Sequence, residues 1–163
     1  MVSGAKTKVA SLVLTVVVLT ALCLPIDVKA VGLSRGCTLW QRMGYISLHG
    51  SILHALVNLW CLLSLCFNRN IPLWQFVTSY AIAVSYPTFL MGDGTTVGLS
   101  GMIFALLGMI SLASSRWHVN VAFCMVIIGF GYLLPNIDAS LHLYCYIAGL
   151  AVGAINKPVL WTR

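Results

Sequence analysis

Apolar stretches without any charged residue follow one another along almost the whole chain, separated by short polar breaks. Hydrophobic residues make up 60% of the 163 residues and charged residues 7%, which is too apolar for a soluble domain of this size. A helix that crosses a bilayer needs about 20 apolar residues. The sequence therefore predicts an all-α polytopic membrane protein, one domain over residues 1–163 without a separate soluble domain, with six spans at residues 9–24, 46–67, 71–91, 100–115, 117–134 and 139–155.

The positions of the charged residues predict how the spans are oriented. Lys and Arg are enriched in cytosolic loops, and here one side of the membrane receives only cations, whereas the other receives cations and acids in equal number. We therefore expect both termini in the cytosol, and because the cations are scattered we expect no nucleic-acid partner. The cytosolic set is Lys6, Lys8, Arg69, Arg116, Lys157 and Arg163, and the opposite set is Lys29, Arg35, Arg42, Asp27, Asp93 and Asp138.

The first apolar stretch admits a second interpretation. Lys6 and Lys8 before it, and the small residues around Lys29 after it, also fit a signal peptide with its cleavage site. The stretch is longer than the apolar region of about 7 to 15 residues that is usual in such peptides. We therefore favour a retained span, and the orientation of the other spans is the same either way.

The six cysteines predict neither a disulfide framework nor a metal site. Most of them lie within or at the ends of apolar stretches, and no CxxC pair occurs, so we interpret them as free thiols that act as small apolar side chains. His49 and His54 are not spaced as in the HExxH zinc motif. We expect no metal and no other cofactor.

Polar side chains inside the second stretch mark it as a place to seek function, because burying them in lipid is costly. His54 and Asn58 are separated by about 40° around a helix and so share one face. On the same helix His49 points about 140° away from His54, and we assign His49 to structure or loop anchoring. The alternative for each of these residues is an interhelical hydrogen bond that holds the bundle together.

Three reactive side chains are predicted at one depth in the membrane. His54, Ser100 and His142 each lie about 15 residues before the next cytosolic cation, hence about 22 Å from the cytosolic boundary of a hydrocarbon layer of about 30 Å. A helix that begins at Ser100 is too short to reach the outer surface, so the preceding loop must dip towards a hydrated pocket. The free backbone N–H groups at that helix start can stabilise an oxyanion.

These residues also follow a specific order along the chain. The second span carries His49, His54, Asn58, Leu59 and Trp60, the fourth opens with Gly98, Leu99, Ser100 and Gly101, and the sixth carries His142. This set closely resembles the rhomboid family of intramembrane serine proteases. The resemblance implies a six-helix rhomboid-like bundle in which Ser100 is the nucleophile and His142 the general base, without the acid of soluble triads. It also implies an oxyanion site formed by His54, Asn58 and the Ser100 N–H.

Small residues on the fourth and sixth spans predict a close contact between these two helices. Such a contact would let Ser100 and His142 meet, whereas the alternative is ordinary helix packing unrelated to catalysis. The residues of this small-residue stripe are Gly101, Ala105, Gly108, Gly149 and Gly153.

Three departures from the family pattern lie near the expected site. Cys145 replaces the usual glycine after the histidine, Phe104 replaces a frequent tyrosine, and Gln41 separates the usual Trp-Arg pair. The bulkier Cys145 could widen the helix contact unless a small partner residue makes room for it, and Phe104 keeps a ring that can pack against His142. No proline precedes Ser100, so a hallmark of inactive rhomboid-like proteins is missing.

The resemblance implies hydrolysis of a peptide bond in or near a transmembrane segment of another membrane protein, with lateral entry between the second and fifth spans. The scissile bond is expected towards the non-cytosolic side, near small or helix-destabilising residues, and loops 91–97 and 135–138 are candidate covers. Two alternatives stay open: an inactive rhomboid-like protein that binds transmembrane helices, and a small channel or transporter with a histidine proton relay. The expected location is a bacterial plasma membrane, with an organellar membrane as the alternative.

Overall fold

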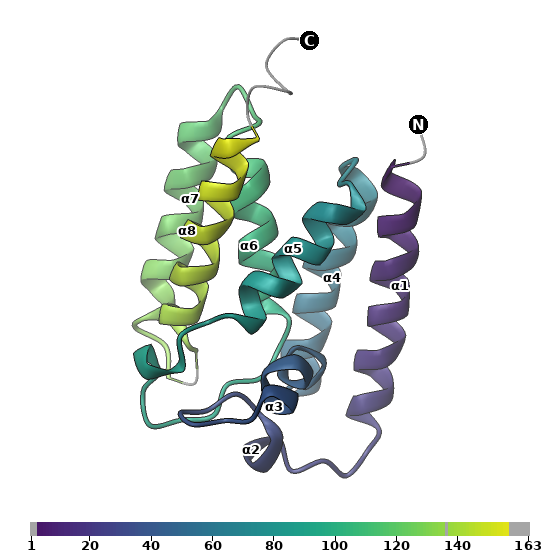
Figure 1. Cartoon of the computed structure of the whole chain (residues 1–163), viewed down its shortest axis with the longest axis vertical. Coiled ribbons are helices and arrows are strands. Elements are labelled where there is room, and N and C mark those ends of the chain that lie inside the picture. Colours follow the sequence, from purple (N-terminus) through teal and green to yellow (C-terminus); the bar gives the residue numbers. More distant parts are fainter. Residues whose placement is uncertain (1–2, 136, 157–163) are drawn as a thin grey trace.

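The computed structural model describes residues 3–135 and 137–156, and within these ranges it contains helices and no strand. The longer helices stand side by side as a bundle (Figure 1). They are α1 (Ser3–Leu22), α4 (Ile52–Asn68), α5 (Leu73–Val84), α6 (Ser100–Ser111), α7 (Trp117–Gly131) and α8 (Ala139–Ile155). The all-α prediction is therefore confirmed. α6 contacts each of α4, α5, α7 and α8, and so forms the centre of the bundle.

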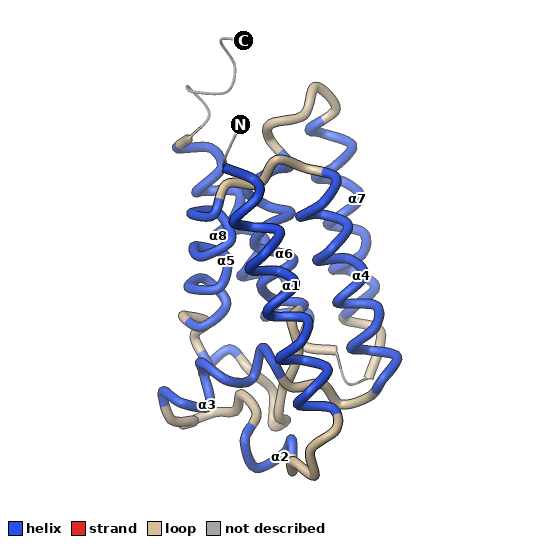
Figure 2. The backbone as a smooth tube through the Cα atoms, turned by 90° about the vertical axis from the view of Figure 1, so that its right-hand side faces the viewer, coloured by secondary structure: helices blue, strands red, loops and turns tan. Residues whose placement is uncertain are grey.

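Short helices gather at one end of this bundle. α2 and α3 lie there, near the end of α1 and the beginning of α6, whereas α1 begins and α8 ends at the opposite end (Figures 1 and 2). The predicted orientation, with both termini on one side, requires this arrangement. The short elements are α2 (Val28–Val31), α3 (Leu39–Gly44), η1 (Tyr45–Ser47) and η2 (Thr88–Leu90).

The cations that support the predicted orientation fall only partly within the described ranges. Arg69 follows α4 and Arg116 precedes α7, so both lie at the same end of the bundle as the start of α1. Lys157 and Arg163, which were counted on the same side, lie outside the described residues, as does Asn136 in the last polar break. The side of the membrane on which these residues lie stays a prediction.

The second apolar stretch does not form one helix from residue 46 onwards. The segment Leu39–Ser47 is bent by 84° against Ile52–Asn68. Ser51 starts α4, because its side chain accepts a hydrogen bond from the free N–H of His54. The prediction that His49 shares a helix with His54 is therefore wrong, and His49 lies in the loop before α4.

Four helices, α4, α5, α6 and α7, are also shorter than the predicted spans, whereas α8 has the predicted bounds and α1 begins earlier than predicted, at Ser3. α5 ends at Val84, because Pro87 lacks an N–H and restricts the residue before it. By length and apolar composition, one described helix, Gly4–Leu22, is long enough to cross a membrane, and the bent pair of Leu39–Ser47 and Ile52–Asn68 is a second if taken as one span. The remaining long helices are apolar but have 10–17 residues. The number of spans stays a prediction.

α1 is attached to the bundle by a polar contact as well as by apolar packing. It lies against α4 and α5. Thr7 and Ser11 are fully buried, and the Thr7 hydroxyl donates a hydrogen bond to the carbonyl oxygen of Ile71 at 2.7 Å. A satisfied buried hydroxyl of this kind fixes the register of α1 against the segment that enters α5. The choice between a retained span and a signal peptide stays untested.

α6 and α8 approach each other so closely that Gly108, Gly149 and Gly153 have no room for a side chain. A Cβ atom added to Gly149 would overlap the carbonyl oxygen of Ala105, and one added to Gly108 would overlap that of Tyr146. The predicted small-residue stripe is therefore confirmed. It brings the two helices that carry Ser100 and His142 into direct backbone contact.

Replacing Gly149 by alanine is expected to force α6 and α8 apart and to lower the free energy of unfolding by about 1–3 kcal/mol. The matched control is Gly129→Ala on α7, where an added Cβ has no neighbour within 4 Å. Thermal unfolding of the detergent-solubilised protein measures both. Equal unfolding midpoints for the two variants would contradict the proposed close packing.

Candidate active site

Ser100 and His142 face each other across the contact between α6 and α8. Each lies in the first turn of its helix. The distance between His142 Nε2 and Ser100 Oγ is 2.8 Å, which is that of a hydrogen bond. A serine hydroxyl that donates to a neutral imidazole can lose its proton as it attacks a carbonyl carbon.

The ring of Phe104 lies against the imidazole of His142. Phe104 follows Ser100 by about one helical turn on α6, and the two rings are stacked with centroids 4.5 Å apart and planes at 26°. Such stacking limits the rotation of the imidazole and excludes water from one of its faces. The prediction that Phe104 packs against His142 is confirmed, although this chain lacks the hydroxyl of the usual tyrosine.

Gly98 allows two polar side chains of α4 to approach the backbone just before Ser100. Its φ is 126°, in the region that only glycine adopts readily. A Cβ atom at this position would lie 2.9 Å from Cε1 of His54 and 3.4 Å from Nδ2 of Asn58. Both constraints require glycine here. His54 and Asn58 therefore lie next to the turn that leads into the nucleophile, on the face that their spacing predicted.

His49 contacts the site more directly than its predicted anchoring role suggests. Its buried ring lies beside α4, with Nε2 3.2 Å from Nδ2 of Asn58. The same Nε2 accepts a hydrogen bond from the Leu99 N–H at 3.4 Å. Because a backbone N–H only donates, this nitrogen carries no proton and Asn58 donates to it as well. His49 thus holds both an expected oxyanion residue and the residue before Ser100.

A cleft of about 1680 Å³ opens beside this group of residues. Ser100, His142, His54 and Asn58 all line it, so the pocket predicted around Ser100 is present. Its walls include apolar side chains of α4 (Leu53, Val57, Cys61) and of α7 (Phe123, Ile127), and its rim includes Thr95, Thr96, Val97, Pro135, Ile137 and Asp138. The two loops expected as covers therefore border the cleft.

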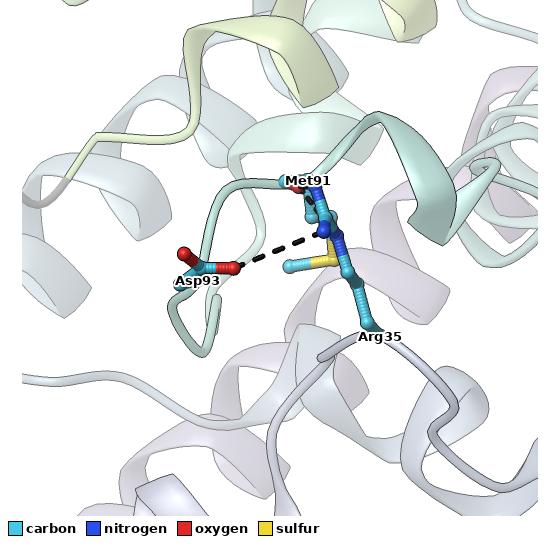
Figure 3. A network of polar contacts seen from close by, with 3 residues as sticks. All are labelled: Arg35, Met91 and Asp93. Carbon is cyan, nitrogen blue, oxygen red and sulfur yellow. Dashed lines mark hydrogen bonds and ion pairs between the residues drawn. The ribbon is translucent and has the colours of Figure 1, made fainter.

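The loop before α6 is bound by Arg35, which lies in the segment that precedes α3. The guanidinium group of Arg35 donates to the carbonyl oxygen of Met91 at 2.8 Å, and it lies 3.8 Å from the carboxylate of Asp93 (Figure 3). Both side chains of this ion pair are exposed, so it contributes little to stability by itself. The hydrogen bond to Met91 fixes the start of the loop.

Cys145 does not separate the two helices. Its side chain is fully buried and faces Gly101 on α6. A Cβ atom at Gly101 would lie 3.3 Å from Cys145 Sγ, so the glycine leaves the room that the thiol needs. The Ser100 and His142 side chains remain at hydrogen-bond distance.

Asp138 contributes to the site in a way that counting charges did not reveal. Its carboxylate accepts a hydrogen bond from the Leu141 N–H at 3.0 Å and so caps α8. Its backbone carbonyl accepts from the N–H of His142 at 3.2 Å. An Asp directly before an apolar helical run is a common N-cap signal, so this role was readable from the sequence.

The comparisons with known proteins point to one family. Residues 36–158, most of the chain, match the family model described as Rhomboid domain. The matched range includes α4, α6 and α8, and with them the residues that line the polar part of the cleft. Neither the curated proteins nor the solved structures contain a match to the chain.

Replacing His49 by alanine is expected to destabilise the protein, because the Leu99 N–H and the Asn58 amide lose their acceptor. A buried polar group without a partner costs about 1–3 kcal/mol. His49→Gln, whose side-chain oxygen can accept, should recover part of the loss, and His118→Ala at an exposed position of α7 should change little. If His49→Ala unfolds at the same temperature as His118→Ala, these hydrogen bonds do not support the site.

Proposed function

Because the chain belongs to the rhomboid family, we propose that it is an intramembrane serine protease with Ser100 as nucleophile and His142 as general base. Members of the family are integral membrane proteins, and most are serine proteases, although inactive relatives exist. The observation that carries the proposal is the 2.8 Å contact between Ser100 Oγ and His142 Nε2, both of which line the cleft.

In the acylation step, Ser100 Oγ attacks the carbonyl carbon of the scissile peptide bond while its proton passes to Nε2 of His142. The tetrahedral intermediate collapses when the C–N bond breaks. His142 then gives the proton to the leaving amine nitrogen. The stacked ring of Phe104 keeps the imidazole in the orientation that both proton transfers need.

The negatively charged oxygen of the tetrahedral intermediate needs hydrogen-bond donors, in addition to the base His142. The Ser100 N–H is free at the start of α6, and the side chains of His54 and Asn58 lie against Gly98 beside it. Donors that are already in place cost no reorganisation during the reaction, and each is worth roughly 10² to 10³ in rate. His49 accepts one of the two Asn58 amide protons, which leaves the other for the oxyanion.

In the deacylation step, a water molecule attacks the acyl-enzyme and His142 Nε2 takes its proton. The ester bond to Ser100 Oγ breaks, and the proton returns to that oxygen, which restores the starting state. Water must therefore reach Ser100. The cleft provides the route, because it is lined by polar residues such as Asn58 and Asp138 as well as by apolar walls.

The substrates that fit this cleft are transmembrane segments of other membrane proteins. The cleft is lined by both α4 and α7, and large apolar side chains of its walls are exposed, such as Leu53 at 73% and Phe123 at 64%. A helix in the lipid can approach between α4 and α7 and unwind towards Ser100. We propose a bacterial plasma membrane as the location. The site would face the non-cytosolic side, because the cations Arg69 and Arg116, which favour the cytosolic side, lie at the opposite end of the bundle.

The protein reconstituted in liposomes is expected to cleave a single-span reporter substrate that has small, helix-destabilising residues near its outer end. Ser100→Ala and His142→Ala should each lower the rate by about 10³-fold or more. Ser64→Ala, on α4 but outside the cleft lining, is the control and should cleave normally. An intact substrate with the unaltered protein, or unchanged cleavage by Ser100→Ala, would contradict the proposal and favour an inactive relative.

A tryptophan at Val57 is expected to narrow the cleft between α4 and α7, because Val57 lines its wall. Cleavage of the transmembrane reporter should fall about tenfold or more, mainly through KM, because a partly blocked pocket loses binding free energy. Reaction of Ser100 with a small fluorophosphonate should change little. Leu56→Trp, on the exposed surface of α4 and outside the cleft lining, is the control. Equal cleavage by the two tryptophan variants would exclude entry by this route.

A further inference from the structure

Thr96 joins three parts of the molecule that are far apart in the sequence. Its backbone N–H donates to the carbonyl oxygen of Leu33 at 2.8 Å, and its carbonyl oxygen accepts from the Leu33 N–H at 2.9 Å. Its side-chain hydroxyl donates to Oδ2 of Asp138 at 3.2 Å. The segment before α3, the loop before α6 and the start of α8 thus meet at one residue.

The hydrogen bond between Thr96 and Asp138 joins two residues that lie close in sequence to the reactive side chains: Thr96 precedes Ser100, and Asp138 precedes His142. Asp138 is the cap of α8, and its carbonyl oxygen binds the N–H of His142. Thr96 lies on the short segment that enters α6 at Ser100. The α6–α8 glycine contact fixes the two helices along their length. Among the described residues, the Thr96–Asp138 bond is the only hydrogen bond between the loop of residues 91–99 and α8 with its cap, Asp138.

We propose that the hydrogen bond between Thr96 Oγ1 and Asp138 Oδ2 is a positioning contact that keeps Ser100 and His142 at reacting distance during turnover, an inference that rests on the proposed protease function. Both residues lie on the rim of the cleft, next to the space that a substrate would occupy. A displacement of about 1 Å between reacting groups can cost roughly 10² in rate. A rim contact that resists this displacement therefore acts on catalysis more than on folding.

The neighbouring threonine provides a matched control. Thr95 lies on the same loop and also borders the cleft, but its hydroxyl donates to the carbonyl oxygen of Lys29 at 3.3 Å. Thr95 therefore has a hydrogen bond of similar length in the same loop that does not connect the loop to α8. Valine at either position keeps the branched shape and removes only the hydroxyl.

Steady-state cleavage of the transmembrane reporter tests the positioning role. Thr96→Val is expected to lower kcat by on the order of tenfold with little change in KM and in the unfolding midpoint. Thr96→Ser should restore kcat, and Thr95→Val should retain it. A wild-type kcat for Thr96→Val, or a lower unfolding midpoint without a lower kcat, would overturn the positioning role.

A double-mutant cycle tests whether Thr96 acts through Asp138. Asp138→Ser keeps a side chain that can cap α8 but is too short to reach the Thr96 hydroxyl. The variant with both Thr96→Val and Asp138→Ser should be about as slow as the slower single variant. If the two losses multiply, the residues act independently and the contact is not the cause.

Hydrogen exchange separates a failure of this inference from a failure of the proposed function, because exchange needs no turnover. Thr96→Val, but not Thr95→Val, is expected to speed amide exchange at residues 99–102 and 139–143. If the unaltered protein cleaves nothing and Thr96→Val still shows this pattern, the contact stands and the protease function fails. If the protein cleaves its substrate and Thr96→Val changes neither exchange nor kcat, the contact has no positioning role.

Discussion

The backbone contact between α6 and α8 is the constraint on which the rest of the structure depends. Between helices that lie in lipid, apolar burial gives little preference for one partner over another, and association relies on close packing. Gly108 and Gly149 supply this packing, because neither position has room for a Cβ atom. Gly101 extends the contact to the helix starts, where it makes room for Cys145. Since both helices begin at this contact, their first turns bring a hydroxyl and an imidazole together.

The loop that enters α6 depends on the segment between α1 and α4 for its shape. Successive residues of this loop are bound by residues that come much earlier in the chain. Leu33 pairs with Thr96, the carbonyl of Tyr45 accepts from the Gly98 N–H at 3.0 Å, and the ring of His49 accepts from the Leu99 N–H. Hydrogen bonds from the segment between α1 and α4 therefore fix the backbone conformation just before Ser100. The chemistry is carried by α6 and α8, but their geometry at the rim is set by residues outside both helices.

The sequence predicts the helical class, the helices that carry the reactive residues and the small-residue contact, because each depends on local composition or spacing. It predicts the shared face of His54 and Asn58 for the same reason. The start of α4 and the place of His49 were predicted wrongly, because a long apolar run hides the break at Gly50 and Ser51 that the 84° bend reveals. The contacts of Thr96 with Leu33 and Asp138 could not be predicted, because they join segments that are far apart in the sequence and follow no periodic pattern.

The central claim is that Ser100 is a nucleophile activated by His142, and reaction with a fluorophosphonate tests it most directly. The reagent reports on the serine without requiring the correct substrate, and mass spectrometry of the digested protein locates the adduct. The account predicts a single adduct on Ser100 that forms at least about 10²-fold more slowly in His142→Ala, since the hydroxyl then lacks its base. An unmodified Ser100, or equal rates with and without His142, would contradict it.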